Sequence, residues 1–440
     1  MSRIVYRIFT LLQQILASVP VGTNLGLFHL LWALLSGRFL LSRGAVFPAL
    51  AALGLSDDAV RRSDAALRDG HFDFAKILAS WNKIVLGEGH WRVHCYEGIE
   101  PVSCDLVGFF RPRLVDCASK HYRSEAAKAL PALPYAIITP VGSVGGQRLG
   151  LLKECLRLAP NESEADLQRR ALRKAGKDLS SSQALIVDAG FPLADLLACG
   201  VDRFVTRAKS NATFRRNYLP KPKKLGRPCE YGEKVRPRTR THDGKKIPAT
   251  PADATARWKD AEYTLTARIY NNLVASEAKP GSTPLRCVVI DDPRYKEELV
   301  LVTNLMTLSA YALWRLYKDR WPIEQLPLAA KSMLGAERSF VFGKESRWRL
   351  PELALLAGNV LSYVAATSTP MATGFWDRRL RPTCGRLRRL LMAVDFSKLA
   401  LPEGELRKKQ VVTAHLPKGV KGHRRQKAPK DVLKRLKRAA

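Results

Sequence analysis

The sequence predicts a mixed α/β protein whose two flanking regions are helical and whose middle contains strands. Short apolar runs that end in turn residues occupy residues 96–209, where they alternate with segments of helical period. Helical period also dominates residues 1–90 and returns after residue 309. With 440 residues, 46% of them hydrophobic, the chain can bury a large core, which excludes a disordered protein.

The charge balance predicts a polyanionic partner. The chain has 73 Lys and Arg against 40 Asp and Glu, a formal net charge of +33. Such an excess repels itself unless a polyanion neutralises it, and nucleic acid is the leading candidate. A membrane surface is the competing polyanion, but the apolar stretch from Leu25 to Leu35 is much shorter than the roughly 20 residues that span a bilayer. We therefore expect no membrane partner.

Cysteine usage and the N-terminus indicate a cytoplasmic protein. The eight cysteines contain no C-x-x-C pair, which favours reduced thiols over disulfides or a zinc site. His90, His94 and Cys95 come nearest to a metal cluster, but no fourth ligand lies nearby in the sequence. Arg3 and Arg7 interrupt the N-terminal apolar residues, so no signal peptide is expected.

Residues 1–95 are interpreted as a helical DNA-binding domain. Within it, residues 45–68 have the pattern of a helix-turn-helix, with Ser56 placed to cap the second helix. Arg61 and Arg62 on that second helix could contact phosphates or bases. The alternative is that these are two amphipathic helices packed on the body of the protein, and the sequence does not decide between them.

Residues 96–209 predict the first part of a sheet-based core. The expected elements are a strand at 99–110, a hairpin of strands at 135–141 and 148–153, a helix at 161–174, a strand at 183–188, a helix at 192–199 and a strand at 203–208. Three strands, a helix, a strand, a helix and a strand are what the first half of a ribonuclease H-like core requires. Fold-level analogy of this kind does not establish a function.

The rest of the chain divides into three regions. Residues 210–298 are interpreted as a basic, partly β-stranded insertion, because residues 215–246 carry twelve Lys or Arg against three acids. Residues 299–370 predict the second part of the core, with helices at 309–334 and 351–366. Residues 371–440 end in a basic tail, in which residues 406–440 hold thirteen Lys or Arg and one acid. We expect that tail to follow a DNA backbone, and the alternative is a solvated tail without a specific role.

The most specific pattern lies in the predicted helix at 309–334. Four residues with two, three and six residues between them fall within about 60° of one another on a helix, and they are Tyr317, Arg320, Glu324 and Lys331. Pro322 and Pro327 each remove a backbone donor and are expected to kink or restart the helix near Glu324. A solvated charged face is the alternative to a functional site.

This spacing resembles the YREK signature of the DDE transposases of the IS-four family of insertion sequences, which includes the Tn-five and Tn-ten enzymes. Trp321, directly after the arginine, is similar to the Tn-five-like pattern. Residues 187–191 resemble the strand that carries the family's second aspartate, and residues 203–207 resemble the strand that follows it. The resemblance covers residues 99–366.

The resemblance implies a catalytic and metal-binding triad of Asp105, Asp188 and Glu324. In this family the first aspartate lies mid-strand early in the core, where Asp105 is the natural candidate and Asp116 the alternative. Asp188 ends a buried strand, with a helix N-cap role as its alternative. Asp188 and Glu324 lie 136 positions apart, which leaves room for an insertion domain like that of the Tn-five relatives.

Three carboxylates suit the chemistry that the resemblance implies. Mg²⁺ prefers oxygen ligands, and an acidic triad can hold two such ions, with Mn²⁺ as a substitute. One ion activates water or a 3′-hydroxyl and the other stabilises the leaving oxygen. The resemblance assigns phosphate contacts near the scissile end to Tyr317, Arg320 and Lys331, which would steady a flipped base during a hairpin step. Trp321 could stack there or belong to the core.

The predicted function is metal-dependent cut-and-paste transposition, with cleavage at the ends of an insertion sequence and strand transfer into target DNA. The expected partners are double-stranded DNA, both transposon ends and target, and a second copy of the chain in a synaptic complex. One alternative is a non-catalytic DNA-binding regulator that uses residues 45–68. Another is a ribonuclease H-like nuclease without a role in transposition.

Overall fold

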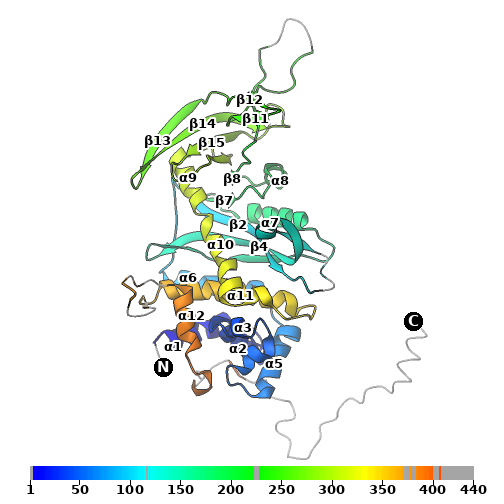
Figure 1. Cartoon of the computed structure of the whole chain (residues 1–440), viewed down its shortest axis with the longest axis vertical. Helices are drawn as coiled ribbons and strands as arrows, with labels where there is room; N and C mark the ends of the chain where they lie inside the picture. Colours follow the sequence, from blue (N-terminus) through cyan, green and yellow to red (C-terminus); the bar gives the residue numbers. More distant parts are fainter. Residues whose placement is uncertain are drawn as a thin grey trace, which may run out of the picture.

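The computed structural model describes residues 3–399 except 115, 116, 118, 222–226, 371, 373–375, 379, 381 and 382, together with residues 406 and 407. Asp116, the alternative first aspartate, and nearly all of the predicted tail at 406–440 lie outside the described residues. Helices gather at one end of the molecule, a strand-rich region lies at the other, and the main sheet runs between them (Figure 1).

The centre of the main sheet has the neighbour order β6, β4, β2, β7 and β8. These strands are β2 (Glu100–Phe110), β4 (Lys128–Val144), β6 (Glu154–Arg157), β7 (Gln183–Val187) and β8 (Phe204–Arg207). The β2–β4 and β4–β6 pairs are antiparallel, while β7 is parallel to both β2 and β8. This α/β arrangement is consistent with the ribonuclease H-like core expected from the element order.

The predicted hairpin is confirmed with changed boundaries. β4 turns through Gly145 and Gly146, whose positive φ angles favour glycine, into β5 (Gln147–Gly150). The second strand predicted at 148–153 is wrong in its second half, because the chain then leaves β5 and returns to pair with an earlier part of β4 as β6. Two further strands flank β4: β1 (Arg92–Val93) and β3 (Lys120–Arg123).

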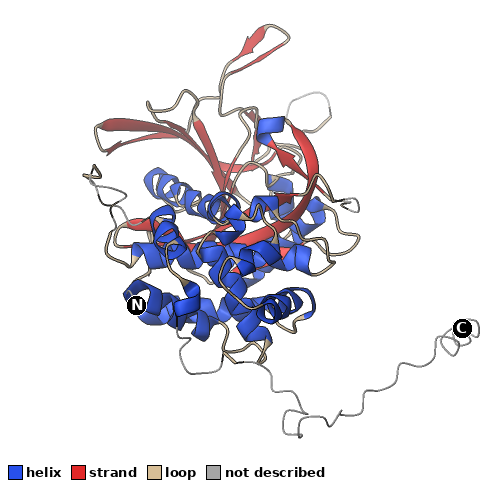
Figure 2. Cartoon of the chain, turned by 60° about the horizontal axis from the view of Figure 1, so that its bottom comes forward, coloured by secondary structure: helices blue, strands red, loops and turns tan. Residues whose placement is uncertain are grey.

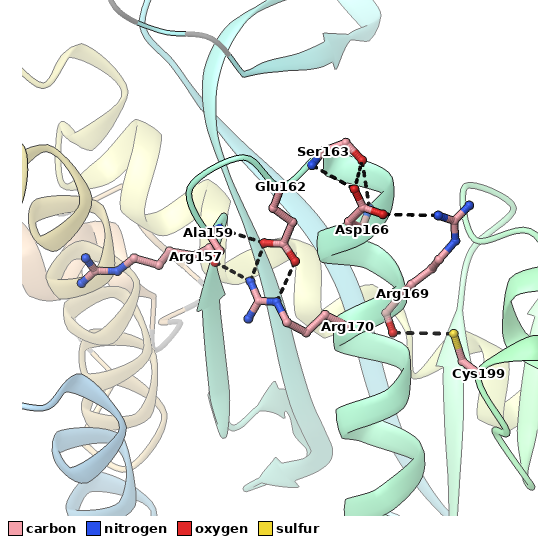
Figure 3. A network of polar contacts seen from close by, with 8 residues as sticks. All are labelled: Arg157, Ala159, Glu162, Ser163, Asp166, Arg169, Arg170 and Cys199. Atoms are coloured by element: carbon pink, nitrogen blue, oxygen red, sulfur yellow. Dashed lines mark hydrogen bonds and ion pairs between the residues drawn. The ribbon is translucent and has the colours of Figure 1, made fainter.

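Helix α7 (Glu164–Asp178) covers one face of the core sheet together with α8 (Leu193–Ala198). Its start is well fixed in the sequence: Ser163 caps the N–H of Asp166, and the Asp166 carboxylate accepts in return from Ser163. Figure 3 shows this capping box beside an ion pair between Glu162 and Arg170. Arg170 also donates to the Arg157 carbonyl at 2.7 Å, which ties the helix to β6.

Residues 210–298, interpreted from the sequence as a partly β-stranded insertion, contain strands that continue the core sheet. From the β8 edge the order continues through β16, β15, β14, β9 and β10, with β13 paired to β14. Their bounds are β9 (Phe214–Arg216), β10 (Lys234–Val235), β13 (Ala254–Asp260), β14 (Tyr263–Ala275), β15 (Leu285–Asp291) and β16 (Leu299–Thr303). A separate small hairpin joins β11 (Arg240–His242) to β12 (Lys245–Ile247).

The helical end is built around α11 (Ser346–Ala366), which is buried on nearly all sides. It packs against the N-terminal helices and against β4 and β5 (Figures 1 and 2). The surrounding elements are α1 (Arg3–Ile15), α2 (Thr23–Leu35), α3 (Arg38–Leu41), α4 (Val46–Ala51), α5 (Asp57–Asp69), α6 (Phe74–Glu88), α12 (Cys384–Met392), η3 (Ala336–Arg338) and η4 (Phe396–Lys398). Within the described part of the chain, no helix is both long and apolar enough to cross a bilayer.

The helical segment predicted at 309–334 restarts near Glu324, as the two prolines led us to expect. The segment forms α9 (Ala310–Lys318), then α10 (Trp321–Leu328), then one π-helical turn, η2 (Ala329–Met333). Asp319 ends α9, and Pro322 lies in the first turn of α10, where its missing N–H is tolerated. Pro327 also lacks an N–H donor, and the π turn begins two residues after it. The four signature residues therefore lie on three helical segments.

Candidate active site

Parallel pairing of β2 and β7 brings the first two predicted acids together. Ser103 of β2 pairs with Ile186 of β7. Asp105 lies two residues after Ser103, and Asp188 lies two residues after Ile186, directly beyond the end of β7. Neighbouring strands lie about 4.8 Å apart, so these two residues are lateral neighbours. Asp188 follows the end of β7 and accepts a hydrogen bond from the Gly190 N–H at 2.8 Å, so its carboxylate shapes the turn and does not cap α8, whose N-cap residue is Pro192.

Helix α10 supplies the third acid. Glu324 lies in the first turn of α10, and α10 packs directly on β2. An acid in the first turn of a helix is favoured by the helix dipole. The Glu324 carboxylate accepts a hydrogen bond from the Arg320 guanidinium one turn earlier. The chain thus directs Glu324 toward the same end of the sheet as Asp105 and Asp188.

The pKa of Asp105 responds to the nearby charges of Asp188 and Glu324. Burial, followed by the negative charge of Asp188, raises the pKa of Asp105 to about 7, and Glu324 contributes in the same direction. Arg320 and the Leu106 N–H, which donates to Asp105 at 2.8 Å, oppose that rise. Burial and the charges of Asp105 and Asp188 also raise the pKa of the adjacent Cys104 thiol. The site therefore concentrates negative charge that the protein itself balances only in part.

The three carboxylates do not form a closed metal centre as they stand. In the part of the chain that the structure describes, no three His, Cys, Asp or Glu side chains converge closely enough to hold an ion. The donor chemistry fits a divalent metal, since all three ligands are carboxylates and their charges repel one another. Glu324 would have to turn from Arg320 to join Asp105 and Asp188.

Arg320 and Tyr317 lie beside the acids. The Arg320 guanidinium lies 5.9 Å from the centre of the Tyr317 ring, and 16% of the Arg320 side chain is exposed. Burial raises the pKa of Tyr317, and the charge of Asp188 adds to that rise. Tyr317 and Arg320 thus lie at the edge of the acidic group although α9 and α10 are separate helices.

Lys331 departs from the other three signature residues. It lies in the π turn, and its ammonium group sits 5.3 Å and 5.5 Å from the ring centres of Phe109 and Phe110. Burial lowers the pKa of Lys331. It lines a cavity of about 620 Å³ together with Arg43 and Arg123, and this cavity is separate from the one that Tyr317 lines. The predicted common helical face is therefore wrong for Lys331.

A basic and aromatic cavity of about 520 Å³ opens next to the acids. Trp321 borders it and is 60% exposed, so it belongs to the surface and not to the core. The remaining lining includes cations and aromatics from β5, β8, α9 and the loop between β15 and β16, among them Arg148, Arg207, Arg294, Tyr295, Lys296 and Trp314. Three acids, Asp292, Glu297 and Glu298, also line it, so cations outnumber acids without excluding them. Such a surface suits a nucleic-acid backbone with an unstacked base.

Sequence reasoning missed the residues of this cavity that come from distant segments. Arg148 and Lys296 have no sequence pattern that sets them apart from other surface cations. Asp319 lies between Tyr317 and Arg320 in the signature and carried no expectation, yet its side chain is fully buried. His94, considered as a metal ligand with His90 and Cys95, instead contacts Asp319 at 2.7 Å.

The two predicted N-terminal DNA contacts lie on α5. Ser56 caps this helix by accepting from the Ala59 N–H, as expected. Arg61 is exposed, while Arg62 pairs with Asp58 one turn earlier. Helix α5 packs against α2, α4 and α11, so it is part of the helical end of the molecule. The role of Arg61 and Arg62 toward DNA stays a prediction.

Comparison with curated proteins finds no match. A family model described as a transposase DDE domain matches residues 154–347, from β6 to the start of α11. The matched segment contains Asp188 and the whole 317–331 signature, and Asp105 lies before it. Domains of this kind carry nuclease or transposase activity and generally use divalent metals. Residues 154–347 are thus similar to a transposase DDE domain, which supports placing this chain among the DDE transposases.

Proposed function

We propose that the chain is a cut-and-paste DNA transposase, of the IS-four type with its YREK signature, whose catalytic residues are Asp105, Asp188 and Glu324. The observation that carries this proposal is that three acids, from β2, the end of β7 and α10, lie near one another, where burial first and then the charges of Asp188 and Glu324 raise the pKa of Asp105 to about 7. A bound cation would offset the cost of ionising Asp105 in this place.

The acids are proposed to hold two Mg²⁺ ions, for which Mn²⁺ can substitute. Bound metal would activate the attacking water or 3′-hydroxyl and stabilise the leaving oxygen. The protein's own part is to supply ionised carboxylates: Asp105 must lose its proton, and Glu324 must exchange its hydrogen bond with Arg320 for a ligand position. Once released, Arg320 is free to bind a DNA phosphate.

The cavity beside the acids supports a DNA substrate. Arg320 and Tyr317 line it next to the carboxylates, and Trp321 presents an exposed ring on which a base can stack. We place the scissile phosphate at the acids and the flanking strand along this cavity. Lys331 lies outside the cavity, so its phosphate contact would involve a different stretch of the same DNA.

Synapsis of two transposon ends would take two copies of the chain on DNA in the cytoplasm. Arg61 and Arg62 on α5 are proposed to assist in end recognition, since Arg61 is exposed.

The test is Mg²⁺-dependent cleavage of a labelled duplex that carries the terminal repeats flanking the gene. Wild type should cut at the repeat boundary, while Glu324→Gln should bind the duplex and leave it uncut. Glu352→Gln is a matched control, because Glu352 is another buried carboxylate held by an arginine but lies in α11. Binding without cleavage by wild type would favour a regulator, and cleavage of duplexes without repeats would favour a nuclease.

A further inference from the structure

We propose that Asp319 is a positioning residue that fixes the joint between α9 and α10 and thereby aims Arg320 and Glu324 at Asp105. The inference rests on the proposed function of Glu324 and adds a residue that acts through the others. Asp319 ends α9, and its N–H donates to the Leu316 carbonyl at 3.1 Å. Arg320 follows at once, so any rotation of the joint moves the residue that holds Glu324.

The Asp319 side chain is fully buried and must be held by its neighbours. His94 Nδ1 lies 2.7 Å from Oδ2, and the Tyr96 hydroxyl donates to the same oxygen at 2.8 Å. Burial, and then the charge of Asp319, raise the pKa of Tyr96 to about 12, so its hydroxyl keeps the proton that it donates. Arg148 Nε lies 3.3 Å from Oδ1 as an ion pair, and this oxygen accepts no hydrogen bond in the described part of the chain. An isolated buried carboxylate costs several kcal/mol, which these three partners offset in part.

The same segment, residues 94–97, also holds the other end of α9. The Glu97 carboxylate accepts hydrogen bonds from the N–H and the hydroxyl of Ser309, the N-cap residue of α9. Between the two ends, the Arg315 guanidinium lies 5.2 Å from the centre of the Tyr96 ring. The segment therefore fixes both the axis and the rotation of α9, and Asp319 is its contact at the end nearest the acids.

A third link joins Asp319 to the strand of the first catalytic acid. The Ser103 hydroxyl donates to the Asp319 backbone carbonyl at 3.2 Å. Ser103 precedes Asp105 by two positions on β2, so the two side chains lie on the same face of the strand. The joint is thus tied to the strand whose carboxylate must meet Glu324, and this separates Asp319 from an ordinary buried ion pair.

Asp319→Asn preserves volume and removes the charge, and Glu352→Gln makes the same change in the buried pair with Arg157. Both variants should lower the unfolding midpoint. Only Asp319→Asn should speed amide hydrogen exchange in peptides spanning 316–328, by roughly 10-fold, a measurement that needs no DNA. It should also slow cleavage of saturating terminal-repeat duplex by about 10–100-fold, raise the Mg²⁺ concentration for half-maximal cleavage, and leave the Kd for that duplex within about 3-fold.

Tyr96→Phe provides a second, milder variant, because it removes one hydrogen bond to Asp319 and keeps the ring. It should change exchange at 316–328 and the Mg²⁺ requirement in the same direction, by about 3-fold, and it carries the test if Asp319→Asn does not fold. Wild-type exchange at 316–328 in these variants, or a cleavage loss no greater than that of Glu352→Gln, overturns the proposal. If wild type itself does not cleave, the proposed function fails, and the exchange data still decide whether Asp319 fixes the joint.

Discussion

Asp105 and Glu352 are both buried carboxylates, and burial raises the pKa of each, but their surroundings differ. Arg157 binds Glu352 through two hydrogen bonds of 2.9 Å and 3.0 Å, one to each oxygen. The nearest charges to Asp105 include two further acids, and the one arginine nearby donates its hydrogen bond to Glu324. Arg157 neutralises Glu352 within the protein. The acids around Asp105 are neutralised less completely by the protein, and the proposed metal ions would supply the missing positive charge.

The largest expected effect tests this difference at Asp188. Asp188→Asn should reduce cleavage by roughly 10³-fold or more, because the proposed site loses a ligand, while DNA binding stays near the wild-type level. Gel-shift and cleavage assays on one labelled duplex measure both. In contrast, Glu352→Gln should lower stability by about 2 kcal/mol, less than for a fully enclosed pair because a third of Arg157 reaches solvent, and keep cleavage within a few-fold. Equal cleavage losses in the two variants would contradict the comparison.

Arg320→Ala tests the role of the arginine that lies beside the acids and donates to Glu324. If Arg320 moves from Glu324 to a phosphate, its loss should slow the step after nicking by about 10–100-fold and weaken binding much less. Quenched-flow separation of nicked and fully cut products measures the two steps. Arg169→Ala is the control, because Arg169 also pairs with acids but lies on α7. A parallel loss of binding and nicking would argue against the phosphate role.

Removal of residues 408–440 tests the basic tail and leaves Leu406, which packs in the helical core, in place. The variant should bind all duplexes about 10-fold more weakly at physiological salt and show a shallower dependence of log K on log salt. Fluorescence anisotropy titrations from 50 to about 200 mM salt provide the slope. The expectation is wrong if the slope of the truncated protein equals that of the full chain.

The smallest effect is a gain in stability. Because the folded-state pKa of Asp105 is raised from 3.8 to about 7, this group lowers the free energy of unfolding as pH rises from about 4 to 7. Metal-free Asp105→Asn should therefore unfold at a higher temperature than wild type, by about 2 °C or more at pH 8, and the gap should shrink toward pH 4. Differential scanning calorimetry across pH measures it. An unchanged midpoint at pH 8 would mean that the fold does not raise the pKa of Asp105.

Local patterns predicted much of the fold. The strands at 100–110 and 183–187 agree with expectation, and the helix expected at 161–174 is found at 164–178, because alternation, buried β-branched runs and helical period act within a few residues. The helical segment at 309–334 restarts near Glu324, as its two prolines predicted. The expectation that all four signature residues share one helical face was wrong for Lys331, which lies in the π turn beside Phe109 and Phe110.

The sequence by itself determined the candidate residues for the proposed chemistry: an acid at the end of a buried strand, an acid in a proline-bounded helix and an excess of cations. Only the tertiary structure decided their relations. Parallel pairing placed Asp105 beside Asp188, and contacts across more than two hundred positions joined His94 and Tyr96 to Asp319. Such contacts depend on which surfaces bury together in the whole chain, and no local propensity encodes them.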